Sequence, residues 1–357
     1  MATTFKKLGS NDIVAQRSLL HEAIPITGSI VSGTYGNNNI KNYSHGMFQS
    51  VYDYPYLSSS ANHIFDLTMG YASDSKLSAS TSTQNSKKIN LYTQLAQVLM
   101  GFDATGSIQQ FDEDGDLAAG GAKLKECFFV NFSRLLEKDE IKKGSFQLEL
   151  GVSGAIRPGA FQDRIVLKDT NAQNEFKVNS PAGEYAILYG TNTAGTRLKK
   201  ADNAGETVKT GLIFYQAGIA VITGSVFGGL LSSSVEFASG SGGTETVNQA
   251  MTSSISGACD GLRHRMYNLS FNNTTELNST MFFCRANNND FNYSSNVTYL
   301  SSSRLRVKNN ASDIPVSYIT SVGLYSANNE LLAVAKLSEP LKKDPTQEFI
   351  LKVRLDY

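Results

Sequence analysis

Cysteine and histidine are scarce in this chain, and their spacing excludes several kinds of site. The 357 residues include three cysteines, which lie too far apart for a disulfide framework or a zinc site (Cys127, Cys259 and Cys284). Cys127 and Cys284 adjoin phenylalanines, so we expect both to be small buried side chains of a protein that folds in a reducing cytoplasm. None of the four histidines has metal-ligand spacing (His21, His45, His63 and His264).

Charge is also sparse, and neither sign is in excess. Lys and Arg number 32, Asp and Glu number 32, and together they make 18% of the chain. Binding to phosphates needs a local excess of basic side chains, so we expect no nucleic-acid partner. Net neutrality leaves little repulsion between copies of the chain. We expect the scattered basic pairs to lie on solvated faces (Lys87-Lys88, Lys142-Lys143, Lys199-Lys200 and Lys342-Lys343).

A secretion signal and a membrane span are not indicated either. The first residues, 1–7, precede no apolar run, which argues against a leader peptide. Residues 210–235 carry no charge and are long enough to cross a bilayer, but they include five glycines and several polar side chains. The part from 211 to 224 is typical of two short buried strands around Gly218. We therefore expect no membrane partner.

Sequence patterns of catalysis are missing. There is no nucleophile elbow, no phosphate-binding Gly-rich loop and no pair of carboxylates that can be singled out for glycoside hydrolysis. A serine, histidine and aspartate could be combined on paper from almost any chain this rich in serine, so such a set carries no weight. The sequence predicts neither an enzyme nor a bound cofactor.

The acidic run at residues 112–116 (DEDGD) imitates a calcium loop. An EF-hand needs glycine at its sixth position and a bidentate glutamate at its twelfth. Counted from Asp112, these positions hold Leu117 and Lys123. The pattern favours a tight turn, with a non-standard cation site as the alternative.

Strand patterns outnumber helix patterns and predict a mainly β fold with a few helices (α+β). Residues 349–357 alternate between apolar and polar over much of their length, as in a strand with one buried face. With 318–325 and 331–337 they predict a three-stranded antiparallel unit in a sandwich-like carboxyl-terminal domain. Further strands are expected at 127–132, 146–152, 164–167, 185–189, 266–271 and 280–285.

Two helices and two regions are expected. Residues 87–101 place Leu91, Leu95, Val98 and Leu99 on one apolar stripe and end at Gly101, a good capping residue. A weaker helix is expected at 245–256, one or two turns at 133–140, and a solvated turn at Arg263-His-Arg265.

Composition separates a Ser/Asn/Tyr-rich region, 1–125, from a β-rich region, 126–357, with a looped insertion at about 153–262.

Several segments resemble structural proteins of the virions of large contractile-tailed marine bacteriophages, the cyanophage-like myoviruses. The amino-terminal likeness lies at 19–28 (LLHEAIPITG), 43–57 (YSHGMFQSVYDYPYL) and 62–66 (NHIFD). The other resembles a module of tail and baseplate proteins, at 286–300 (ANNNDFNYSSNVTYL), 317–325 (SYITSVGLY), 329–337 (NELLAVAKL) and 348–357 (EFILKVRLDY). The resemblance implies a structural role, so no catalytic residues carry over.

The function that follows is a hypothesis about assembly. We expect a non-enzymatic virion component, made in the bacterial cytoplasm, that joins subunits of a tail or baseplate. Its expected partners are other virion proteins and copies of itself in a symmetric oligomer. Alternatives are a peripheral receptor- or glycan-binding tail module, and a neck or head-tail connector component.

Aromatic residues are the candidate contact residues. Tyrosine is common at interfaces because it offers apolar area and a hydroxyl at a small entropic cost. The candidates are Tyr52, Tyr54, Tyr56, Phe291 and Tyr293. The alternative for the first three is that they alternate on one strand and pack a local core.

Overall fold

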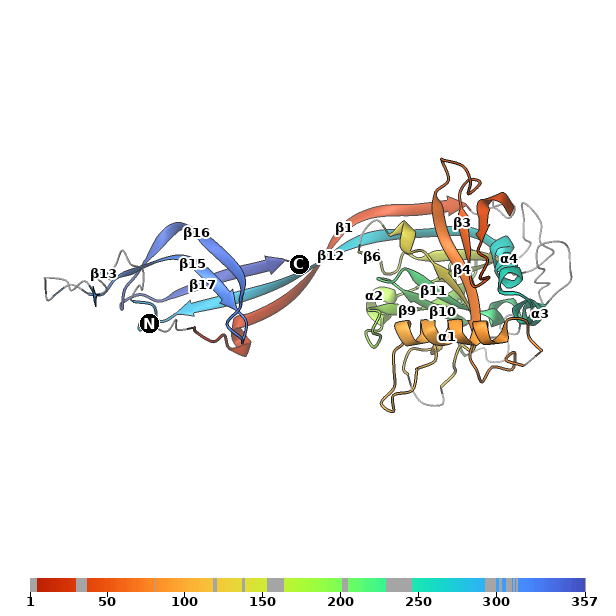
Figure 1. Cartoon of the computed structure of the whole chain (residues 1–357), viewed down its shortest axis with the longest axis horizontal. Coiled ribbons are helices and arrows are strands. Elements are labelled where there is room, and N and C mark those ends of the chain that lie inside the picture. The colour runs from red at the N-terminus through yellow and green to blue at the C-terminus, as the bar shows by residue number, and fades with distance from the viewer. Residues whose placement is uncertain are drawn as a thin grey trace. The chain divides into compact units, whose positions relative to one another are not determined.

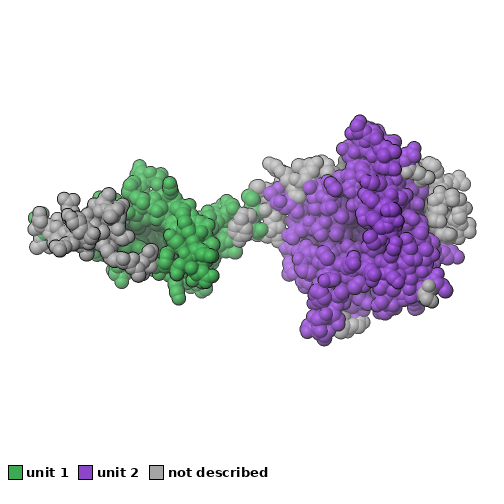
Figure 2. Space-filling model, viewed as in Figure 1, with its two compact units in different colours: residues 1–20, 276–357 green, residues 21–275 purple. Residues whose placement is uncertain are grey.

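The chain forms two compact units. Unit 1 comprises residues 1–20 and 276–357, and unit 2 comprises residues 21–275 (Figure 2). The computed structural model describes residues 5–29, 37–79, 81–117, 121–136, 139–152, 164–200, 205–228, 246–292, 300–301, 304–305, 310, 312 and 314–356. These residues form antiparallel strands and four α-helices, which confirms the predicted mainly β, α+β class.

The units divide the chain differently from the two regions expected from composition. The boundary at residue 125 falls inside unit 2, where β4 (His63–Tyr71) pairs with β5 (Glu126–Asn131). Strands from both sides of that boundary therefore share one sheet. Residues 153–262, expected as a looped insertion, contribute four of the strands of that sheet.

A long antiparallel sheet builds unit 2. Beginning from the part of β12 that lies in this unit, the strand order is β12-β7-β8-β9-β10-β11-β5-β4-β3-β2. The remaining bounds are β2 (Ile40–Asn42), β3 (Gln49–Tyr52), β7 (Gln147–Gly151), β8 (Arg164–Lys168), β9 (Tyr185–Thr191), β10 (Lys209–Phe214), β11 (Ile219–Thr223) and β12 (Met266–Ala286). The short β6 (Glu140–Ile141) also pairs with β12. As predicted, two buried strands, β10 and β11, flank Gly218, which has a φ of +64°.

Both faces of this sheet are covered, which explains its continuous apolar runs. Along β5, Phe128 and Val130 enter one hydrophobic core, while Cys127 and Phe129 enter a second core on the opposite face. Side chains of β9, β10 and β11 divide between the two cores in the same alternating way. Helices α3 and α4 pack into the first core and α1 into the second (Figure 1).

The helices differ in detail from the predicted ones. Their bounds are α1 (Asn85–Leu99), α2 (Ala172–Glu175), α3 (Val247–Thr252) and α4 (Ile255–Arg265), with 3-10 turns η1 (Ser10–Asp12), η2 (Asn37–Asn39), η3 (Ser133–Leu135) and η4 (Gly224–Phe227). The helix expected at 245–256 ends at Thr252, because Ser253 is extended. Ser254 then caps α4, whose Gly257 N–H donates to the Ser254 hydroxyl.

The apolar stripe predicted for the first helix was wrong in part. Its buried residues are Lys88, Tyr92, Ala96 and Leu99, whereas Val98 is 63% exposed. Polar groups decide this orientation. The Tyr92 hydroxyl donates to the Leu124 carbonyl at 2.7 Å, and Lys88 Nζ donates to the carbonyls of Met251 (2.7 Å) and Ser253 (2.6 Å).

Unit 1 combines two distant parts of the chain. The regular elements of its described residues are strands and the turn η1. Residues 279–286 of β12 pair with β17 (Phe349–Asp356), and β15 (Ser317–Tyr325) pairs with β16 (Leu331–Lys343). In the strand order β1 (Ile13–Ser29) lies beside β12, and β13 (Leu300–Ser301) pairs with β14 (Arg304–Leu305). The predicted three-stranded unit was therefore wrong, because β17 joins β12. The alternation along β17 is confirmed, with every second side chain from Phe349 to Leu355 turned inward.

Candidate functional site

The three candidate tyrosines of unit 2 lie at the end of β3 and in the loop that follows. The strand ends at Tyr52, so these tyrosines do not alternate on one strand as the alternative reading required. Tyr54 and Tyr56 are exposed, next to Leu57, which is 85% exposed. The loop is closed by Asn62, whose backbone N–H donates to Asp53 Oδ1 at 2.6 Å and whose side-chain amide donates to Asp53 Oδ2 at 2.8 Å.

The other two candidates belong to unit 1. Phe291 is exposed, and its carbonyl accepts a hydrogen bond from the Ser317 hydroxyl. Lys343 holds the preceding turn by donating to the Asn288 carbonyl at 3.1 Å and to Asn292 Oδ1 at 2.8 Å. Tyr293 lies outside the described residues. Of the candidates that the structure describes, Tyr52, Tyr54 and Tyr56 belong to unit 2 and Phe291 belongs to unit 1.

The described part of unit 1 buries few hydrophobic side chains. Among its described residues only two hydrophobic side chains are buried, Ala286 and Val353. Both hydrophobic cores of the described chain belong to unit 2. Unit 1 nevertheless carries eleven of the seventeen large hydrophobic side chains that are exposed in the described chain: Phe5, Ile13, Val14, Phe291, Ile314, Tyr318, Tyr325, Leu331, Leu332, Val334 and Ile350.

Many of these side chains lie on one surface, which we call the β15–β16 face. It is built by the cross-strand pairs Ser321–Lys336, Gly323–Val334 and Tyr325–Leu331, with the exposed pair Tyr318–Lys342 beyond a register shift. Paired residues of antiparallel strands share a face. Tyr318, Tyr325, Leu331 and Val334 are between 44% and 60% exposed.

Glycine shapes the centre of that face. A Cβ atom on Gly323 would lie 2.9 Å from Cε2 of Tyr325 and 3.4 Å from Cδ1 of Leu331, so its absence lets these two side chains lie over the strand. The Phe5 ring packs on Tyr325 with centroids 4.6 Å apart. The sequence did not single out this surface, because the run 331–337 reads as a buried strand.

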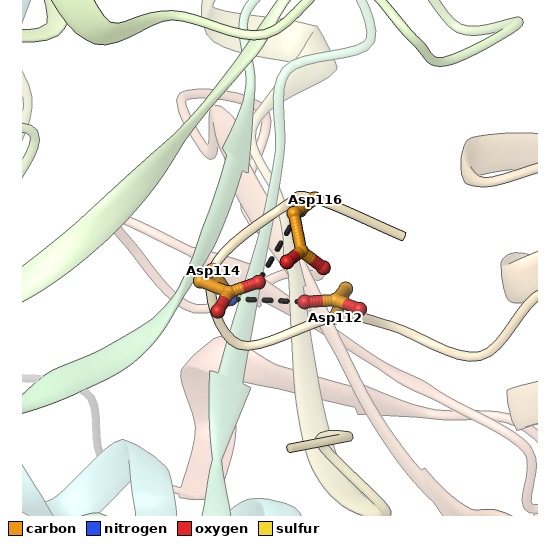
Figure 3. A group of neighbouring side chains, drawn as sticks. All are labelled: Asp112, Asp114 and Asp116. Carbon is orange, nitrogen blue, oxygen red and sulfur yellow. Dashed lines mark hydrogen bonds between the residues drawn. The ribbon is translucent and has the colours of Figure 1, made fainter. Parts of the chain in front are cut away.

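The acidic turn brings Asp112, Asp114 and Asp116 together, as Figure 3 shows. One carboxylate oxygen from each lies within 4.8 Å of the others. Asp112 is buried, and its Oδ1 accepts the backbone N–H groups of Asp114 (3.0 Å) and Gly115 (3.1 Å). Its other oxygen is paired with the ammonium of Lys123, which occupies the twelfth position where a calcium loop has glutamate. The loop thus contains a positive charge of its own.

A serine, a histidine and an aspartate do meet in unit 2, but not as a catalytic triad. The Ser50 hydroxyl donates to Asp66 Oδ1 at 2.5 Å, and His63 Nε2 lies 2.7 Å from the same oxygen. A triad needs the histidine between the serine and the aspartate. Here the aspartate is central, so this contact does not activate the serine.

Sequence reasoning missed a buried polar network in unit 2. Lys143 Nζ contacts Glu140 at 3.0 Å and Glu184 at 2.6 Å and lies 5.1 Å from the centroid of the Tyr215 ring. The Tyr215 hydroxyl donates to Asp169 at 2.9 Å. Burial raises the pKa of Asp169 to about 7, although backbone N–H groups also donate to its carboxylate. All five of these residues are buried, which suits a structural role.

Several basic residues expected on solvated surfaces are buried. Lys88, Lys143 and Lys343, each the second lysine of a pair, are enclosed and donate to carbonyl, amide or carboxylate oxygens. The expected solvated turn at Arg263-His-Arg265 was also wrong, because these residues end α4 and both arginines are buried. Two consecutive basic residues in a sequence do not indicate which oxygen atoms the fold will place beside their side chains.

Among the described residues, every helix is too short or too polar to span a bilayer.

Comparison with known proteins adds no relative. No family model, no curated protein and no solved structure matches the chain.

Proposed function

We propose that this protein is a non-enzymatic structural component of a phage virion that joins subunits in the tail or baseplate. The observation that carries the assembly part is the exposure of apolar side chains in unit 1, which has only two buried hydrophobic residues in its described part. Apolar surface on this scale marks a protein-protein interface. The virion part rests on the sequence resemblance to tail and baseplate proteins.

The proposal is tested by locating the chain in particles. We expect mass spectrometry of purified virions from the phage that encodes it to find the chain in a fixed copy number. Immunogold labelling should place it on the tail or baseplate. Label at the neck would favour the connector alternative, and absence of the chain from purified virions would contradict the virion role.

A receptor- or glycan-binding module is a second candidate, favoured by the loop after β3. Its exposed Tyr54, Tyr56 and Leu57 are held in place by the contacts between Asp53 and Asn62. Rigid exposed aromatic rings are suited to stacking on sugars or to packing on a receptor. Binding of the purified chain to host surface polysaccharide, lost in Tyr54→Ala, would support this candidate.

A further inference from the structure

We propose that the β15–β16 face of one copy of the chain binds unit 2 of a second copy, so that copies join head to tail. This inference rests on the proposed assembly function and names the partner. Three features support this contact: the area of the face, the opposite formal charges of the two units and an apolar depression on unit 2.

The area of the face matches one side of a stable interface. Phe5, Tyr318, Tyr325, Leu331 and Val334 are each roughly half exposed. An aromatic side chain can bury on the order of 150–250 Å², so the three half-exposed rings alone present roughly 300 Å², and Leu331 and Val334 add to that area. One partner of a standard interface contributes about 800 Å², of which somewhat more than half is apolar. The described part of unit 1 buries only two hydrophobic side chains, so a lasting partner would stabilise it. Identical copies are the commonest lasting partners.

Charge favours contact between unlike units of two copies. Unit 1 contains twelve Lys and Arg against nine Asp and Glu, whereas unit 2 contains twenty against twenty-three. Unit 1 therefore has a formal charge of +3 and unit 2 of −3. Packing two β15–β16 faces on each other would bring Lys336 and Lys342 toward their own copies, and like charges at an interface are unfavourable.

Unit 2 offers an apolar depression with acidic neighbours at the carboxyl end of α1. Its apolar lining residues are Met100, Phe102, Leu117 and Pro181, and Gly101 and the amide side chains of Gln97, Gln109 and Asn179 complete it. Its volume of about 460 Å³ leaves room for protruding aromatic side chains. Asp103 and Asp116 are exposed, and in the chain they directly adjoin the lining residues Phe102 and Leu117. Hydrogen bonds from Thr105 and Ser107 lower the pKa of Asp103, which keeps it ionised.

The contact is heterologous, because the two surfaces that meet are different. Such contacts propagate to a closed ring or to a filament. Either product fits a component that is repeated around or along a particle.

Variants of the full-length chain in which the charges of the two surfaces are exchanged test the proposal. Sedimentation velocity measures their association. One variant carries Lys336→Glu on the β15–β16 face. The other carries Gln97→Lys with Asp116→Lys beside the depression. Lys352→Glu, an exposed reversal on β17, is the matched control, and circular dichroism checks that each variant folds.

We expect each interface variant alone to dissociate at concentrations where the wild type and Lys352→Glu associate, with Kd raised roughly tenfold, which corresponds to about 1.4 kcal/mol. An equimolar mixture of the two variants should associate again, because the exchanged charges attract. The proposal is overturned if Lys336→Glu behaves like Lys352→Glu, or if the mixture stays monomeric. A monomeric chain that is nevertheless found in purified virions would overturn this contact and leave the proposed function standing.

Discussion

Among the individual side chains, Lys123 determines how the acidic turn is stabilised. Its ammonium pairs with the buried carboxylate of Asp112 in a loop that otherwise concentrates negative charge. We expect Lys123→Gln to lower the free energy of unfolding by about 1–3 kcal/mol, because a buried carboxylate loses its counter-charge. Urea denaturation measures the change.

A double variant separates this pair from other effects of the substitution. Asp112→Asn with Lys123→Gln should be destabilised by less than the sum of the single variants. Strict additivity would contradict the pairing. For the wild type we expect EDTA to leave the Tm unchanged, because Lys123 already supplies the positive charge to Asp112.

Asp169 links the stability of unit 2 to pH. Its pKa of about 7 in the fold exceeds the ordinary value of 3.8 for an aspartate, so between these values the folded chain binds a proton that the unfolded chain releases. The stabilisation is fully present below the lower value and is lost as pH rises through the higher one. We expect this residue to lower the free energy of unfolding by up to about 1.4 kcal/mol per pH unit in that window.

Asp169→Asn removes the titrating group and is the measurement that isolates it. Denaturation at a series of pH values should show a flatter dependence in the variant than in the wild type. Lys143, Glu140, Glu184 and Tyr215 remain in place and are common to both proteins. Identical slopes would contradict the raised pKa.

At the scale of elements, α1 packs on the sheet through the backbone of Gly70. A Cβ atom at that position of β4 would lie 2.6 Å from the Lys88 carbonyl oxygen and 2.9 Å from the Tyr92 nitrogen. These are helix backbone atoms and cannot rotate away, so we expect Gly70→Ala to destabilise the fold by about 1–3 kcal/mol. Thermal denaturation provides the measurement.

Gly228→Ala is the control for that substitution. Its Cβ would come no closer than 3.6 Å to Val247, an ordinary contact. We expect little change or a small gain from reduced freedom of the unfolded chain. Equal effects of the two alanines would show that close packing at Gly70 is unimportant.

Local patterns in the sequence were sufficient to find most of the elements but not their partners. Strands such as β5, β9, β10 and β11 follow from short apolar runs, and α1 from its cap and periodicity. Which strand pairs with β17 depends on β12, more than sixty residues earlier in the chain, and no local pattern records that pairing. The inward face of α1 was missed for the same reason, since Lys88 is buried by carbonyls of a distant segment.

The candidate site was predicted less well than the fold. Tyrosines near β3 are exposed as an interface would need, but the larger apolar surface lies on β15 and β16. A run such as 331–337 predicts burial, and the sequence alone does not distinguish burial within one chain from burial between chains. Leu332 and Val334 are an example, because both belong to this apolar run and both are exposed in the single chain.

At the scale of the whole molecule, the exposed face of unit 1 is expected to determine association. We expect Tyr325→Ser with Leu331→Ser to weaken self-association, because the substitutions remove apolar area at the centre of the β15–β16 face. Since both side chains belong to unit 1, the free energy of unfolding of unit 2 should be unchanged. Leu57→Ser, in the exposed loop of unit 2, serves as the control. Loss of association in Leu57→Ser alone would instead assign the interface to that loop.

If another copy of the chain completes unit 1, the full-length protein should associate reversibly. Sedimentation velocity over a wide range of concentrations measures this association. We expect the mass to rise above the 38.7 kDa of one chain as concentration increases, and to fall back on dilution. A mass that stays at 38.7 kDa throughout the range would contradict this expectation.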